Sequence, residues 1–98
     1  MGGYHITVNR LDVAETTRAS SDGNAVAARV RSGEIALGER VYQKGFDWAP
    51  WLNASTNKVP VLEAAGYPNR YLIRARECPH TTGLPPDEWI HVEMWDES

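Results

Sequence analysis

The clearest pattern along the chain is an alternation of apolar and polar residues near both ends. Residues 4–11 read YHITVNRL, in which every second side chain up to Val8 is apolar. Residues 88–95 read EWIHVEMW, with an apolar stripe at every second position. Because successive side chains of a β-strand point to opposite faces, both stretches predict strands with one buried face. The other face of the last strand carries two indoles, an imidazole and a carboxylate: Trp89, His91, Glu93 and Trp95.

Two further stretches in the first half have extended character. Residues 13–20, VAETTRAS, contain a pair of threonines and a weak alternation that favour a second strand. Residues 34–46 predict another strand, which Gly38 interrupts with a bulge or a tight turn.

Residues 67–77 contain a strand in which Tyr71, Ile73 and Ala75 share one face. The connection from this strand to the last one suits antiparallel neighbours in one sheet. Such pairing would bring charged and polar side chains of the two strands to the same face and allow cross-strand ion pairs. The expected partners are Arg74 and Arg76 on one strand, and His91 and Glu93 on the other.

Helix signals occur twice. Ser21 or Asp22 can cap a helix whose short apolar stripe ends before Gly33. Residues 60–66 predict a second, shorter helix, because Pro60 stands at its first position and a glycine follows its end. Residues 47–59 are rich in turn-forming side chains and predict a loop.

These elements predict an α+β fold. With 98 residues there is room for one domain, residues 1–98, and one core. We expect a small, mostly antiparallel sheet of four to five strands, with one helix packed on one face and a second short helix.

Composition narrows the possible partners. The net charge of -3 works against direct binding to nucleic acid, which needs a basic face, but it suits a partner protein with a basic surface. The single cysteine, Cys78, allows no intrachain disulfide. There is no apolar run long enough to span a membrane and no pattern of a signal peptide, so we expect a cytoplasmic protein.

The first half of the chain also resembles a known family. Between residues 6 and 48, the segments TTRASSDG, NAVAARV and SGEIAL are similar to the strand, helix and closing segment of DpnD/PcfM-like small proteins of phages and mobile elements. The helix here is shorter and lacks the acidic positions of that family. The resemblance implies a strand–helix–strand unit and no catalytic motif. In size, acidity and build the chain is also similar to small phage-encoded inhibitors of the anti-CRISPR type.

A second resemblance points to an enzyme class. The start YHIT is similar to the first NAD-binding strand of ADP-ribosyltransferases, and LPPDEWI to a segment that often closes that fold. It implies that His5 and Thr7 would contact the cofactor, that Tyr42 would supply the aromatic ring, and that Glu88 or Glu93 would supply the carboxylate. The alternative is that His5 lies on the solvent-facing side of a first strand.

Other chemistry is less well supported by the sequence. Cys78 and His80, with His91 and Glu93, offer zinc-binding atoms, but Cys-x-His is not a usual chelating spacing. No helix start or glycine-rich turn stands beside Cys78 to activate it as a nucleophile. We therefore predict no metal, no cofactor and no catalytic residue, and expect Cys78 to be a loop thiol.

The tryptophans are the strongest remaining signal. Four in 98 residues fall into two clusters, and tryptophan is common at interaction hot spots. Trp48 and Trp51 suit a core or an interface equally, whereas the other pair favours an interface. Our main hypothesis is a small acidic inhibitor that occludes a basic surface of a partner, such as one on a nucleic-acid-handling complex; an NAD-binding protein and an immunity protein that neutralises a cognate toxin are the alternatives. The candidate contact residues are Trp48, Trp51, Trp89, His91, Glu93, Trp95 and Asp96.

Overall fold

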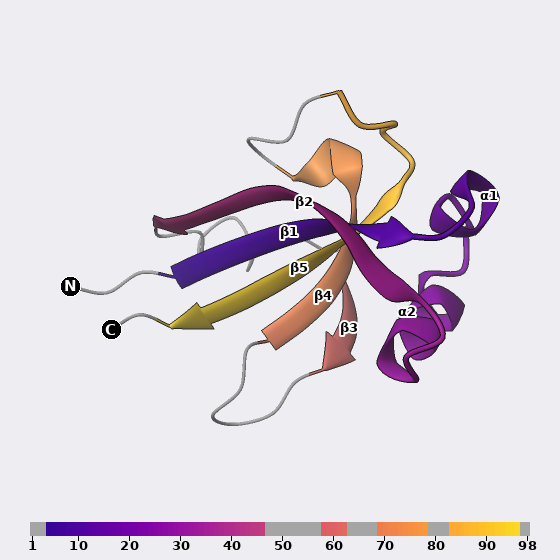
Figure 1. Ribbon diagram of the computed structural model, residues 1–98, viewed down its shortest axis with the longest axis horizontal. Helices are drawn as coiled ribbons and strands as arrows, with labels where there is room; N and C mark the ends of the chain where they lie inside the picture. Colours follow the sequence, from indigo (N-terminus) through magenta and orange to yellow (C-terminus); the bar gives the residue numbers. More distant parts are fainter. Residues whose placement is uncertain (1–3, 47–57, 63–68, 79–82, 97–98) are drawn as a thin grey trace.

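The described part of the chain forms one antiparallel sheet with two helices, which confirms the predicted α+β fold (Figure 1). The computed structural model describes residues 4–46, 58–62, 69–78 and 83–96. In the sheet, the strands lie in the order β2-β1-β5-β4-β3. The elements are β1 (Tyr4–Asp12), α1 (Glu15–Arg18), α2 (Gly23–Arg31), β2 (Ala36–Phe46), β3 (Val59–Leu62), β4 (Asn69–Arg74), a 3-10 turn (Ala75–Glu77) and β5 (Trp89–Asp96).

Both helices lie at one end of the sheet, and the start of β1 and the end of β5 lie at the other (Figure 1). Asp22 caps α2 as predicted, because its carboxylate accepts a hydrogen bond from the backbone N–H of Ala25 at 3.1 Å. Gly33 follows the helix with a φ of 84°, a left-handed conformation that glycine adopts without strain. Neither helix in the described part of the chain has the length and apolar character needed to cross a membrane.

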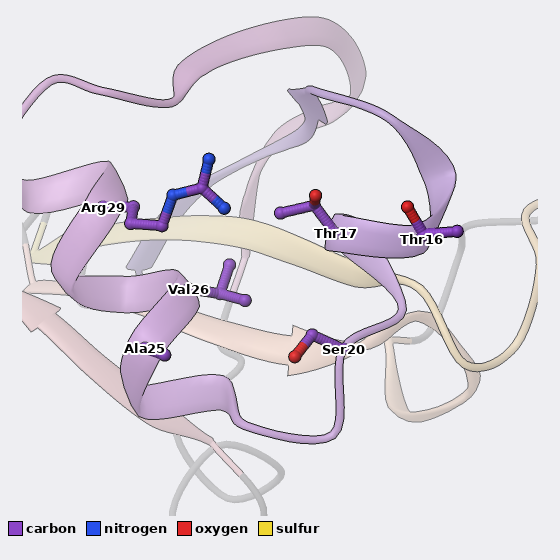
Figure 2. A pocket seen from close by; sticks show the side chains of 6 residues that line it. All are labelled: Thr16, Thr17, Ser20, Ala25, Val26 and Arg29. Atoms are coloured by element: carbon purple, nitrogen blue, oxygen red, sulfur yellow. The ribbon is translucent and has the colours of Figure 1, made fainter.

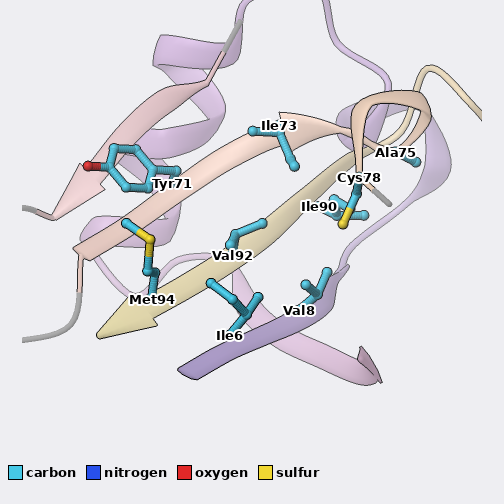
Figure 3. Packing of buried hydrophobic residues seen from close by; sticks show 9 residues of the cluster. All are labelled: Ile6, Val8, Tyr71, Ile73, Ala75, Cys78, Ile90, Val92 and Met94. Carbon is cyan, nitrogen blue, oxygen red and sulfur yellow. The ribbon is translucent and has the colours of Figure 1, made fainter. Parts of the chain in front are cut away.

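One face of the sheet carries the first part of the core (Figure 3). Here the apolar stripes of the three central strands meet, because β1 and β4 both pair with β5 in register. The predicted alternation is confirmed in all three strands. The buried residues of this cluster are Ile6, Val8, Tyr71, Ile73, Ala75, Cys78, Ile90, Val92 and Met94.

The second part of the core lies on the opposite face, beneath α2. Val26, Ala27 and Val30 point from the helix toward the sheet, where they meet Leu72 and Trp89. This packing holds a helix that is too short to be stable by itself. The helix covers only one end of this face of the sheet. The other end of the same face carries polar side chains.

Two predicted elements are wrong. Residues 13–20 do not form a strand, because α1 occupies residues 15–18 and Arg18 bonds the carbonyl of Val13 and the carboxylate of Glu88. Residues 60–66 do not begin as a helix, because Val59–Leu62 form β3. Proline is tolerated there since β3 is an edge strand of the described sheet. The second short helix is therefore α1.

The bulge predicted at Gly38 is confirmed. The pairing of β1 with β2 shifts twice, so that Asn9 lies opposite Arg40 while Leu11 lies opposite Leu37. The carbonyl of Gly38 accepts a hydrogen bond from the Asn9 side chain at 3.1 Å. A β-carbon at Gly38 would lie 3.3 Å from the backbone nitrogen of Asp12, so a larger residue would crowd β1.

Candidate functional site

A group of polar and aromatic side chains lies on the face that α2 covers elsewhere. We call it the polar face and define it by His5 and Thr7 of β1, Arg70 of β4, and His91, Glu93 and Trp95 of β5. The strand register brings these residues together, because His5 lies opposite Trp95 and Glu93 lies between Thr7 and Arg70. Paired residues of antiparallel strands project to the same side of the sheet.

Trp95 and His5 form an aromatic stack within the polar face. Their ring centroids are 4.8 Å apart and the planes are inclined by 27°. The Nε2 atom of His5 also lies 3.1 Å from Nε2 of Gln43 on the neighbouring strand β2. The stack limits the motion of the indole, while Trp95 remains partly exposed to solvent.

His91 is the buried centre of the polar face. Its Nε2 accepts a hydrogen bond from Nε of Arg70 at 3.0 Å, and its side chain is fully buried. Because arginine keeps its protons in proteins, the accepting nitrogen must be deprotonated and the imidazole neutral. Burial and then the positive charge of Arg70 lower the pKa of His91 from 6.5 to about 3.

Glu93 lies at the edge of this cluster. Its Oε1 lies 3.7 Å from Nε of Arg70 and 4.0 Å from Nδ1 of His91. The predicted ion pairs of Glu93 and His91 with Arg74 and Arg76 are wrong. Arg74 lies opposite Trp89, and Arg76 follows the end of β4. The guanidinium of Arg74 stacks on the Trp89 ring at 4.0 Å.

Two of the residues expected to contact a partner are buried. Trp89 is 5% exposed and His91 is 0% exposed, so neither can touch another protein while the domain is folded. Trp89 is buried because the start of α2 packs on it: a β-carbon at Gly23 would lie 2.7 Å from the indole. Trp95 and Glu93 remain as accessible candidates. The other three, Trp48, Trp51 and the side chain of Asp96, lie outside the described residues.

The cofactor-binding set implied by the ADP-ribosyltransferase resemblance is not brought together. His5 and Thr7 lie on the polar face, but Tyr42 pairs with Val8 and packs against the apolar cluster of the opposite face. The five-strand sheet separates the tyrosine ring from the histidine.

Cys78 lies directly after the 3-10 turn, outside the helices and strands, as a loop position predicts. Its side chain is buried in the apolar cluster. Its proposed partner His80 lies outside the described residues. Within the described ranges, there is no group of three or more His, Cys, Asp or Glu side chains that could hold a metal ion.

Arg70 and Gln43 were missed by the sequence analysis. Extending the alternation of β4 back from Leu72 would have placed Arg70 on the same face as Leu72 and Arg74, so that signal was available. Gln43 could not be found, because its contact with His5 depends on two bulges in β2.

A comparison of the chain with family models, with curated proteins and with solved structures finds no match. The chemistry of the polar face and the charge of the chain are therefore the basis for a function.

His91 predicts a dependence of stability on pH. The unfolded chain binds a proton at this residue below about pH 6.5, whereas the folded protein does so only near pH 3, so acid favours unfolding. We expect this residue alone to reduce the free energy of unfolding by about 2–3 kcal/mol between pH 7 and pH 4.5, at about 1.4 kcal/mol per pH unit. Urea unfolding at a series of pH values measures the loss.

The matched variant is His91→Gln, which cannot titrate. Carboxylates titrate in both proteins, so the difference between the two pH profiles isolates His91. We expect the variant to have the shallower profile, and equal slopes above pH 4.5 would contradict a neutral buried imidazole. In the wild type, the NMR signals of this ring should not titrate above pH 4.

Proposed function

We propose that the chain is a small, cytoplasmic, acidic binding protein that occludes a basic surface of a partner protein and catalyses no reaction. The observation that carries the proposal is the partly exposed Trp95, held by its stack on His5 beside the carboxylate of Glu93. The stack belongs to the end of the sheet opposite the helices (Figure 1).

The stack suits binding because it orders the indole in advance. Tryptophan supplies a large contact area, and it is enriched among the residues that dominate binding energy. Immobilising a flexible side chain on association costs about 0.5–1.5 kcal/mol. Trp95 has already lost part of that freedom through His5, so less of the contact energy is used to order it.

Charge favours a basic partner. The chain carries a net charge of -3, which attracts a basic surface before contact. The ion pair of Glu93 with Arg70 and its contact with the neutral His91 ring both use the Oε1 atom. Its Oε2 atom is then available to a lysine or arginine of the partner, and the carboxylate is one-quarter exposed.

Proteins that handle nucleic acid have basic surfaces, because they must neutralise phosphates. A protein that covers such a surface inhibits its partner by competition, which requires no chemistry of its own. This mode agrees with the resemblance of the chain to small proteins of mobile elements. An immunity protein that covers its toxin would use the same kind of contact.

The proposal predicts that binding depends on Trp95 and Glu93. The immobilised wild-type protein should capture from lysate of its source cells a protein with a basic surface, and capture should weaken as salt rises. We expect Trp95→Ala to reduce the affinity at least tenfold. Glu93→Lys should reduce it mainly through slower association at low salt, which surface plasmon resonance measures.

Glu34→Lys is the matched control for charge, because Glu34 is exposed beside the C-terminal end of α2, away from the polar face. It makes the same change in net charge as Glu93→Lys. Equal losses of affinity in the two charge variants would show that only net charge matters, and capture unaffected by Trp95→Ala would show that the polar face is not the interface.

A further inference from the structure

A pocket opens between the two helices, away from the polar face. Figure 2 shows its walls: α1 and the segment after it on one side, and α2 on the other. Its volume is about 250 Å³, which is below the range of about 300–1,000 Å³ typical of pockets for drug-sized ligands. The lining residues are Thr16, Thr17, Ser20, Ala25, Val26 and Arg29.

The chemistry of the lining favours a small anion. Three of the six side chains are hydroxyls, which can donate hydrogen bonds, and one is a guanidinium. There is no carboxylate among the six. Arg29 extends from α2 toward Thr17 across the pocket (Figure 2). A guanidinium matches the geometry of carboxylate and phosphate groups because it presents several N–H donors in one plane.

Arg29 is only weakly engaged by the protein itself. Its Nε donates to Oε2 of Glu34 at 2.9 Å, and within the described residues this is the only polar contact of the Arg29 side chain. The side chains of the pair are 43% and 59% exposed. Exposed ion pairs of this kind contribute only about 0–1 kcal/mol. A ligand can therefore displace Glu34 from the guanidinium of Arg29 with only a small loss of free energy.

The walls of the pocket are held in place by the core. The carbonyl of Ser20 accepts hydrogen bonds from the buried indole of Trp89 and from Nη2 of Arg74. The Oγ atom of Ser20 accepts a hydrogen bond from the backbone N–H of Asp22, which leaves its proton available to a ligand. Val26, on the other wall, is buried in the cluster beneath α2. The pocket does not have to be ordered when a ligand binds.

We propose that this pocket binds a small oxyanion, a phosphate or carboxylate group, between Arg29 and the hydroxyls of α1. The site shares no residue with the polar face, so it is independent of the proposed partner.

The test is an NMR titration of the ¹⁵N-labelled protein with inorganic phosphate, with sulfate and with acetate, each against sodium chloride of equal ionic strength. We expect saturable shifts with a dissociation constant in the millimolar range, confined to the amides of residues 16–20 and 25–29. The phosphate and acetate arms distinguish a tetrahedral from a planar group.

Three variants make the test specific. Arg29→Gln should abolish saturation, whereas Arg31→Gln should not, since Arg31 lies on the same helix but bonds the carbonyl of Val61 at 3.3 Å. Glu34→Gln should tighten binding about two- to fivefold, because it releases Arg29. The amide spectrum of each variant reports whether it is folded. The proposal is overturned if no oxyanion saturates below about 50 mM, or if saturation persists unchanged in Arg29→Gln.

Discussion

Glu88→Gln is expected to lower the free energy of unfolding by about 3–5 kcal/mol, the usual cost of removing one partner from a buried ion pair. The carboxylate of Glu88 is 1% exposed. Its Oε1 lies 2.8 Å from Nη2 of Arg10 and forms a second ion pair with Nε of Arg18. Glutamine keeps the size of the side chain but leaves two largely buried guanidinium groups without a counter-charge.

The loss is expected to be large because the buried cluster of Glu88, Arg10 and Arg18 connects three parts of the fold. Arg10 belongs to β1, Arg18 to α1, and Glu88 stands directly before β5. The hydrogen bond from Arg10 to Glu88 raises the pKa of the arginine above its ordinary value, and the charges of Glu88 and Glu39 add to the rise. Loss of the carboxylate therefore weakens the attachment of α1 to the sheet.

Asp87→Asn provides the control for Glu88→Gln. Asp87 forms an ion pair with Arg76, but the two side chains are 73% and 54% exposed. We expect this variant to lose less than about 1 kcal/mol. Urea unfolding followed by circular dichroism measures both variants. If the two neighbours cost the same, the buried cluster does not stabilise the fold.

The second large effect is expected at Trp89. Trp89→Ala should cost about 3–5 kcal/mol, because it leaves a cavity beneath α2. The variant also removes the hydrogen bond from the indole to the carbonyl of Ser20 and the ring on which Arg74 stacks. Thermal and urea unfolding measure the loss.

Trp95→Ala is the matched substitution on the same strand and the same face. It should cost about 1 kcal/mol of stability, because the indole is only partly buried and its stack on His5 is a modest contact. Its main effect should be on binding. The opposite ranking of the two variants in stability would show that Trp95, and not Trp89, belongs to the core.

The parts of the fold that could be predicted are those with a strong local signal. Alternation identified β1, β4 and β5, because each carries a run of apolar residues at every second position. Asp22 and Gly33 marked the ends of α2 through capping and backbone geometry. Gly38 marked an irregularity in β2.

The predictions that were wrong or missing concern features that depend on contacts between residues distant in the sequence. Residues 15–18 contain two threonines, yet they form a helix because Arg18 is held by Glu88, seventy residues later along the chain. Arg70 was not identified as the partner of Glu93, because the strand register decides it. Trp89 and Trp95 occupy equivalent positions in the alternation, and only the position of α2 makes one buried and the other accessible.

In the proposed complex, the polar face at Trp95 contacts a basic surface of a partner. Photo-cross-linking tests this contact when benzoylphenylalanine replaces Trp95 or, as the control, Leu62, which is 39% exposed on β3 at the far edge of the sheet. In source-cell lysate, we expect position 95 to cross-link to a protein with a basic surface and position 62 to give no such adduct. Heparin, a polyanion that would occupy that surface, should suppress the adduct. Equal cross-linking at the two positions, or none at position 95, would show that the polar face is not the interface.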